Sequence, residues 1–119
     1  MSEEYLGDTS GPVIDTLAAM TGASIDNCDL DAQTMVLVRI AALAAVGAPP
    51  ASYLLHLGVG QEVGLSLEDV EGVLVAVAPI IGAPRVIAAA DAVHDALGLA
   101  VAVAEADIEV LDDDGILDD

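Results

Sequence analysis

The sequence predicts an all-α fold, a small helical domain of about five helices that assembles into a homo-oligomer. The Val-rich apolar runs are longer than strands and are interleaved with Ala and Leu, which favours helices over β-strands. Proline, glycine and capping residues punctuate these runs at intervals typical of helices. Apolar residues make up 55% of the 119 positions. Because a chain this small leaves about a third of its unfolded-state surface exposed, we expect part of this apolar surface to be covered by other copies.

The first two expected helices have clear start signals. Pro12 suits the first position of a helix, and apolar residues follow at helical spacing up to Gly22. Asp29 and Asp31 favour the amino end of the second helix, which ends at Gly47. The second helix is apolar nearly all round, so we expect several neighbours to bury it.

The third and fourth helices are marked in the same way. Pro50 opens the third helix, and Gly64 fits the left-handed residue that commonly follows a helix. Ser66 is an expected N-cap with acids in the first turn of the fourth helix. Pro79 is expected to stop that helix, because proline lacks the amide hydrogen that continues it.

The fifth helix is expected from Arg85 to about Ala104, and the charge pattern then changes. Residues 105–119 hold eight acids in fifteen positions, mixed with aliphatic residues. Repulsion between these acids should keep the segment extended or mobile unless it docks on a partner. We therefore expect one helical domain over residues 1–104 and an acidic tail over residues 105–119.

The charge balance excludes several classes of partner. The chain has 21 acids and two basic residues, Arg39 and Arg85, for a net charge of −19. Nucleic-acid affinity comes mainly from Lys and Arg, so we expect no nucleic-acid partner. Binding to anionic membranes is disfavoured for the same reason. The expected partners are further copies of the same chain, a small organic ligand and, through residues 105–119, another protein.

The sequence also favours a cytoplasmic protein. The amino terminus carries Glu3 and Glu4 where a secretory signal would carry basic residues. The longest uncharged stretch, residues 40–61, contains Gly47 and the Pro49-Pro50 pair, so we expect two buried helices and a turn, with no membrane span.

A single cysteine allows little thiol chemistry. Cys28 has no partner for an internal disulfide or a zinc site. The neighbouring acids Asp26 and Asp29 disfavour a thiolate, so we expect no reactive nucleophile at this position.

The strongest candidate for chemistry lies in the third expected helix. Ser52, Tyr53, His56 and Gly60 are spaced three or four residues apart and share one helical face. A hydroxyl, a phenol and an imidazole would then meet beside a glycine, an arrangement suited to general acid or base catalysis. The alternative, a buried histidine bonded to Ser52 or to a carbonyl, stays open. His94 fits an exposed surface pair with its neighbouring acids.

Two partial motifs predict neither a cofactor nor a metal. Gly58 and Gly60 suggest a dinucleotide-binding loop, but Val63 stands where that motif requires its third glycine. These glycines more simply allow another backbone to approach. Asp112 lies in a stretch similar to a calcium loop, but Val110 would be the first ligand, which excludes an EF-hand.

The order of these signals resembles the carboxymuconolactone decarboxylase family, which includes the alkylhydroperoxidase-like proteins. The similarity covers about residues 31–97 and rests on five features in a fixed order. These are an Ala-rich helix (38–45), a Tyr-Leu-Leu-His segment (53–56), a glycine (Gly64), a Ser-capped helix start (66–74) and a Gly-Ala-Pro turn (82–84). This resemblance implies an all-helical protomer that assembles as a trimer or hexamer.

The redox members of that family carry a Cys-x-x-Cys-x-x-x-His motif with a glutamate twelve residues upstream. At the matching positions this chain has Pro49 and Ser52 for the cysteines and Leu37 for the glutamate, so His56 alone is retained. Without a thiolate no residue can attack a peroxide, and we expect no thiol peroxidase activity. The decarboxylase members do not depend on cysteines, so a cofactor-independent lyase, decarboxylase or isomerase remains open.

Two functions therefore follow from the sequence. The first is a non-redox oligomer that binds or transforms a small organic molecule. If that protein is an enzyme, His56 is the general acid or base, Tyr53 and Ser52 orient the substrate, and Arg39 or Arg85 holds a carboxylate. The second is a non-catalytic oligomer or scaffold that docks a protein partner through its acidic tail.

Overall fold

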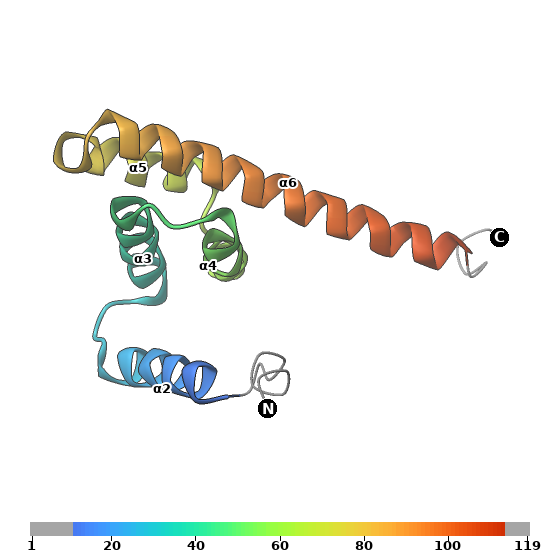
Figure 1. Ribbon diagram of the computed structural model, residues 1–119, viewed down its shortest axis with the longest axis horizontal. Helices are drawn as coiled ribbons and strands as arrows, with labels where there is room; N and C mark the ends of the chain where they lie inside the picture. Colours follow the sequence, from blue (N-terminus) through green and yellow to red (C-terminus); the bar gives the residue numbers. More distant parts are fainter. Residues whose placement is uncertain (1–10, 114–119) are drawn as a thin grey trace, which may run out of the picture. The chain divides into compact units, whose positions relative to one another are not determined.

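The computed structural model describes the backbone of residues 11–113 and the side chains of residues 11–100. This part of the chain is helical, without strands (Figure 1), and its helices are α2 (Pro12–Asn27), α3 (Ala32–Val46), α4 (Pro50–Glu62), α5 (Leu67–Ile81) and α6 (Ala83–Asp113). The expected all-α fold class is confirmed.

The chain divides into two compact units, one up to Leu30 and one from Asp31 onward. In the first unit, α2 has no buried residue, and its large apolar side chains are about half exposed or more: Val13, Ile14, Leu17, Met20 and Ile25. The expected end of this helix at Gly22 is wrong. A glycine inside a helix costs only about 1 kcal/mol relative to alanine, so α2 continues to Asn27, where the side-chain amide donates to the Ala23 carbonyl at 2.8 Å.

The core of the second unit forms where α3 packs against α4, α5 and α6. Its buried residues come from all four helices: Val36, Ile40, Ala44, Tyr53, Val70, Leu74, Ala89, Ala92, Val93 and Ala96. The expectation that several neighbours pack against α3 is confirmed, since α4, α5 and α6 all contact it. In this single chain they cover one face of the helix. Val36, Ile40 and Ala44 form one buried face, whereas Val38 and Val46 are exposed.

The predicted helix ends are confirmed at Asp31, Gly47 and Ser66, and at Ser66 the predicted N-cap is confirmed as well. The Asp31 carboxylate accepts from the Thr34 amide at 2.8 Å at the start of α3. Gly47 ends α3 in the left-handed conformation, with φ +70°. Ser66 and Asp69 form a capping box at the start of α5, in which the Ser66 amide donates to the Asp69 carboxylate at 2.8 Å.

Pro79 does not stop α5, contrary to the sequence-based expectation. The helix runs two residues further, to Ile81. Proline removes one amide donor, but it lies in the last turn, and the Gly82 amide still donates to the Ala78 carbonyl at 3.0 Å. The chain therefore turns at Gly82, where φ is +87°, and not at the proline.

Helix α6 is longer than expected at its carboxyl end. It extends to Asp113, so the first part of residues 105–119 is helical, and the expected extended chain is wrong up to that residue. The segment from Leu99 to Asp114 contains no glycine or proline, and its four alanines have high helix propensity. Residues 114–119 lie outside the described residues. Among the helices that the structure describes, none combines the length and hydropathy needed to cross a membrane.

Candidate functional site

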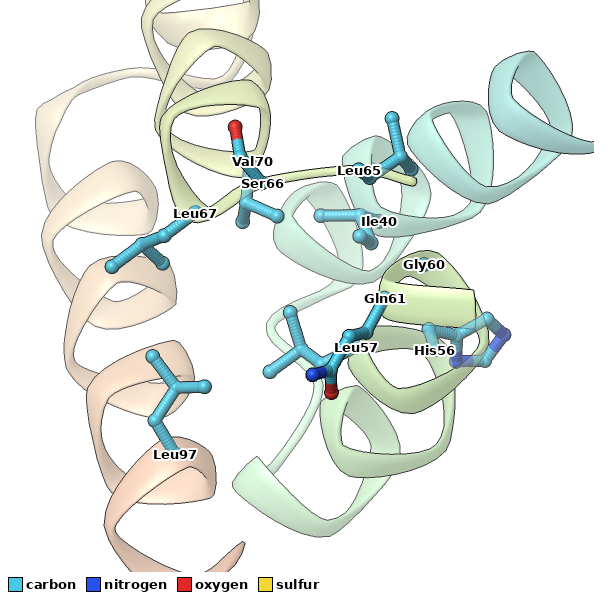
Figure 2. Close-up of a pocket in the computed structure, with 10 residues that line it drawn as sticks. All are labelled: Ile40, His56, Leu57, Gly60, Gln61, Leu65, Ser66, Leu67, Val70 and Leu97. Carbon is cyan, nitrogen blue, oxygen red and sulfur yellow. The ribbon is translucent and has the colours of Figure 1, made fainter. Parts of the chain in front are cut away.

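A pocket of about 340 Å³ lies in the second unit and is bordered by residues of α3, α4, α5, α6 and the segment before α5. Six of its ten lining residues are aliphatic, three are polar and one is glycine: Ile40, His56, Leu57, Gly60, Gln61, Leu65, Ser66, Leu67, Val70 and Leu97. Figure 2 shows Leu57 of α4 and Leu97 of α6 pointing toward each other across this pocket. We call it the larger pocket.

Gly60 is buried where α4 lies next to α3 and to the segment that follows α4. A Cβ atom at Gly60 would lie 3.4 Å from Cγ1 of Val36 and 3.5 Å from Cδ1 of Leu65. These are ordinary van der Waals distances to side-chain atoms, so the close backbone approach that the sequence predicted for Gly58 and Gly60 is not present at Gly60. Gly58 has no neighbouring atom within 4 Å of such a Cβ.

The segment between α4 and α5 is held by hydrogen bonds on both sides. The Leu65 amide donates to the Gly60 carbonyl at 2.8 Å, and the Gln33 side-chain amide donates to the Val63 carbonyl at 2.7 Å. Gly64 lies between them with φ +89°, a conformation that favours glycine. These contacts place Leu65 and Ser66 at the edge of the larger pocket.

His56 is half-buried, and one of its two ring nitrogens is engaged. Nδ1 lies 2.9 Å from the Ser52 carbonyl oxygen. Because a carbonyl oxygen only accepts, Nδ1 carries the proton in this bond, and in the neutral ring Nε2 then has a free lone pair. In Figure 2 the imidazole points away from Leu97, on the opposite side of α4 from Leu57. The bonded histidine that the sequence left open as an alternative is therefore present.

Tyr53 lies in the core and is not among the residues that line the larger pocket. Its side chain is fully buried, and its hydroxyl has no hydrogen-bond partner in the part of the chain that the structure describes. Burial raises the pKa of Tyr53. The orienting roles of the Tyr53 and Ser52 hydroxyls stay predictions, since the contact recorded between Ser52 and His56 uses the Ser52 carbonyl.

The two arginines lie outside the larger pocket. Arg85 is exposed on α6, and a Cβ atom at Gly47 would be 2.8 Å from its Nη1. Its guanidinium therefore lies beside the carboxyl end of α3, where a positive charge stabilises the helix. Arg39 is half-buried on α3. Binding of a substrate carboxylate by either arginine stays a prediction, and the lining of the larger pocket does not support it.

Sequence reasoning missed the aliphatic residues that shape the larger pocket, above all Leu57 and Leu97. A signal was present, because Tyr53, Leu57 and Gly60 recur at helical spacing on one face of α4. The prediction followed the polar side chains of this helix, and so it selected His56 and did not include Leu57.

Within the described residues, no group of three or more His, Cys, Asp and Glu side chains is placed to bind a metal ion. Cys28 is a free, half-buried thiol at the C-cap of α2. Docking through residues 105–119 stays a prediction, since their side chains lie outside the described part.

Comparison with known proteins identifies one family. The family model described as the carboxymuconolactone decarboxylase family matches residues 12–95, which is more than half of the chain. The curated proteins and the solved structures gave no match.

Proposed function

Since the chain belongs to the carboxymuconolactone decarboxylase family, we propose that it is a non-redox member that binds a small organic molecule in the larger pocket. The chain has one cysteine, so it lacks the Cys-x-x-Cys pair of the redox members. The observation that carries the proposal is the lining of the larger pocket, in which six aliphatic side chains surround a few polar groups.

The size and chemistry of the larger pocket fit such a ligand. Small-molecule sites typically have volumes of roughly 300–1,000 Å³ and combine a mostly apolar lining with a few polar groups. The volume here is about 340 Å³, near the lower end of that range, and the polar side chains are His56, Gln61 and Ser66. A compact, mainly apolar molecule is the ligand that this lining favours.

A matched pair of leucine variants tests the proposal. Leu97 lines the larger pocket, whereas Leu99 lies two residues further along α6 and is 49% exposed. Calorimetric titration with cyclohexanol should give saturable binding to the unmodified protein and to Leu99→Phe. Binding to Leu97→Phe should be lost, because the larger side chain fills the space opposite Leu57. Equal binding by both variants would place the ligand elsewhere and refute the proposal.

Self-association is part of the same proposal. Several aliphatic side chains of the second unit are strongly exposed in the single chain: Val46 at 70%, Leu55 at 70%, Val75 at 74% and Ile80 at 84%. Exposed apolar surface of this kind favours contact between copies, and the family resemblance implies a trimer or hexamer. Sedimentation equilibrium should give a mass of several chains, and a stable 11.9 kDa species at micromolar concentration would contradict it.

One observation favours a second candidate, in which the pocket also transforms its ligand. The hydrogen bond from Nδ1 of His56 leaves Nε2 as a proton acceptor, as a lyase or isomerase reaction with a general base requires. Any such activity should be lost in His56→Ala and retained in His94→Ala, with both variants assembling normally. Full activity of His56→Ala would exclude this role.

A further inference from the structure

A second, smaller pocket of about 180 Å³ lies between α5 and α6 and shares lining residues with the larger pocket. Leu67, Val70 and Leu97 line both pockets. We call the second one the smaller pocket. Three shared residues mean that the two pockets meet and form one groove, with these aliphatic side chains at the junction.

The walls of the smaller pocket are two aliphatic stripes. On α5, Leu74 continues the spacing of Leu67 and Val70, and on α6, Ala90 and Val93 precede Leu97 by seven and four residues. Residues at these intervals share one face of a helix. The first and last residues of each stripe are seven positions apart, so the smaller pocket extends the groove by about 10 Å along the two helices.

The charges along the groove select against an anionic ligand. The two pockets are lined by one carboxylate, that of the exposed Glu71, and by two histidines, His56 and His94. Neither Arg39 nor Arg85 is among the lining residues, and the chain carries a net charge of −19. A carboxylate or phosphate would lose its hydration here without gaining a cation, which is unfavourable.

We propose that the groove binds a neutral molecule with an extended aliphatic chain. The polar head lies in the larger pocket, where the Gln61 side-chain amide offers a hydrogen-bond donor and an acceptor. The aliphatic chain passes Leu67 and Leu97 and lies along Leu74 and Val93 in the smaller pocket. This inference rests on the proposed function, since it assumes that the larger pocket binds a small organic molecule, and it adds the class of that molecule.

Burial of a chain in the smaller pocket predicts a measurable dependence on chain length. Each buried methylene contributes about 0.8 kcal/mol, which corresponds to roughly fourfold tighter binding. Dissociation constants of 1-hexanol, 1-octanol and 1-decanol should fall along this series. Decanoate should bind at least about tenfold more weakly than 1-decanol, because its charge is desolvated without a partner.

Two alanines of α6 provide the matched variants. Ala90 lines the smaller pocket and not the larger one, whereas Ala88 lines neither, and both are exposed. Ala90→Phe should remove the gain in affinity from hexanol to decanol and leave cyclohexanol binding unchanged. Ala88→Phe should behave like the unmodified protein for every ligand.

The outcomes separate this inference from the proposed function. If cyclohexanol fails to bind the unmodified protein, the proposed function is wrong. If cyclohexanol binds but chain length has no effect, or Ala90→Phe keeps the full gain, this inference alone is wrong. Equal binding of decanoate would also overturn it. Loss of decanol binding at high protein concentration would also overturn it, because this result would indicate that a second copy occupies the groove. Flotation of the protein with phosphatidylcholine vesicles would overturn it as well, because it would indicate that the groove binds a lipid surface.

Discussion

Substitution of Tyr53 by phenylalanine tests whether this residue belongs to the core or to a site. The Tyr53 side chain has 0% exposure, and no described residue hydrogen-bonds its hydroxyl. Tyr53→Phe removes that hydroxyl and keeps the ring that fills the core.

The expected effect is a more stable protein. A buried hydroxyl without a hydrogen bond costs roughly 1–3 kcal/mol of desolvation, and Tyr53→Phe should recover part of this cost. The free energy of unfolding, measured by urea denaturation, should therefore stay equal or rise by up to that amount. Cyclohexanol binding should be unaffected by Tyr53→Phe, because Tyr53 does not line the larger pocket.

The Tyr53→Phe variant also tests how the free energy of unfolding depends on pH in alkaline solution. Burial raises the pKa of Tyr53, so the unfolded chain releases this proton near pH 10 whereas the folded chain retains it. Stability of the unmodified protein should then fall as the pH rises above about 10, and Tyr53→Phe should lack this contribution. A loss of more than about 1 kcal/mol in Tyr53→Phe at neutral pH would refute the reasoning, because it would show that the hydroxyl has a partner in the assembled protein.

Three further predictions concern the thiol, the helix cap and the surface charge. A hydroperoxide assay with a dithiol donor should show no turnover for the unmodified protein or for Cys28→Ser, and turnover that Cys28→Ser lacks would contradict this. Asp31→Ala should destabilise α3 by removing its cap. The hydrogen bond from the Thr34 amide lowers the pKa of Asp31, so the stabilisation by this cap is present above about pH 4 and is lost in more acidic solution. In urea denaturation, the free energy of unfolding should therefore fall less from pH 7 to pH 3 for Asp31→Ala than for the unmodified protein. The melting temperature should rise from 0.1 M to 1 M NaCl, because the Debye length falls from about 10 Å to about 3 Å and screens the repulsion within a chain of net charge −19. A flat salt dependence would contradict the last prediction.

The helix ends were predictable wherever a local interaction decides them. The cap at Asp31, the left-handed Gly47 and the capping box at Ser66 each depend on residues within a few positions of the helix end. The same rules predict helix ends at Gly22 and Pro79, but in the structure both residues lie inside helices. Each costs the helix little, because Gly22 only lowers the helix propensity at one position and Pro79 only removes one amide donor. The backbone hydrogen bonds on either side continue the helix.

The site was less predictable than the fold, because it depends on contacts between distant segments. The sequence placed His56, Ser52 and Tyr53 on one helix, but it could not show that Tyr53 is buried in the core, where the other helices cover it. It also could not show that Leu57 lines a pocket together with residues of α5 and α6. Helical spacing gives the face of one helix, and the neighbours of that face follow from packing of the whole unit.

The central claim is that the larger pocket binds a small, mainly apolar molecule, and methyl NMR of a leucine-labelled protein tests it most directly. Titration with cyclohexanol should shift the methyl signals of the lining residues Leu57, Leu65, Leu67 and Leu97. The signals of Leu55 and Leu99, which are exposed and do not line the larger pocket, should stay in place. Shifts confined to those two leucines, or no shift at saturating ligand, would contradict the claim.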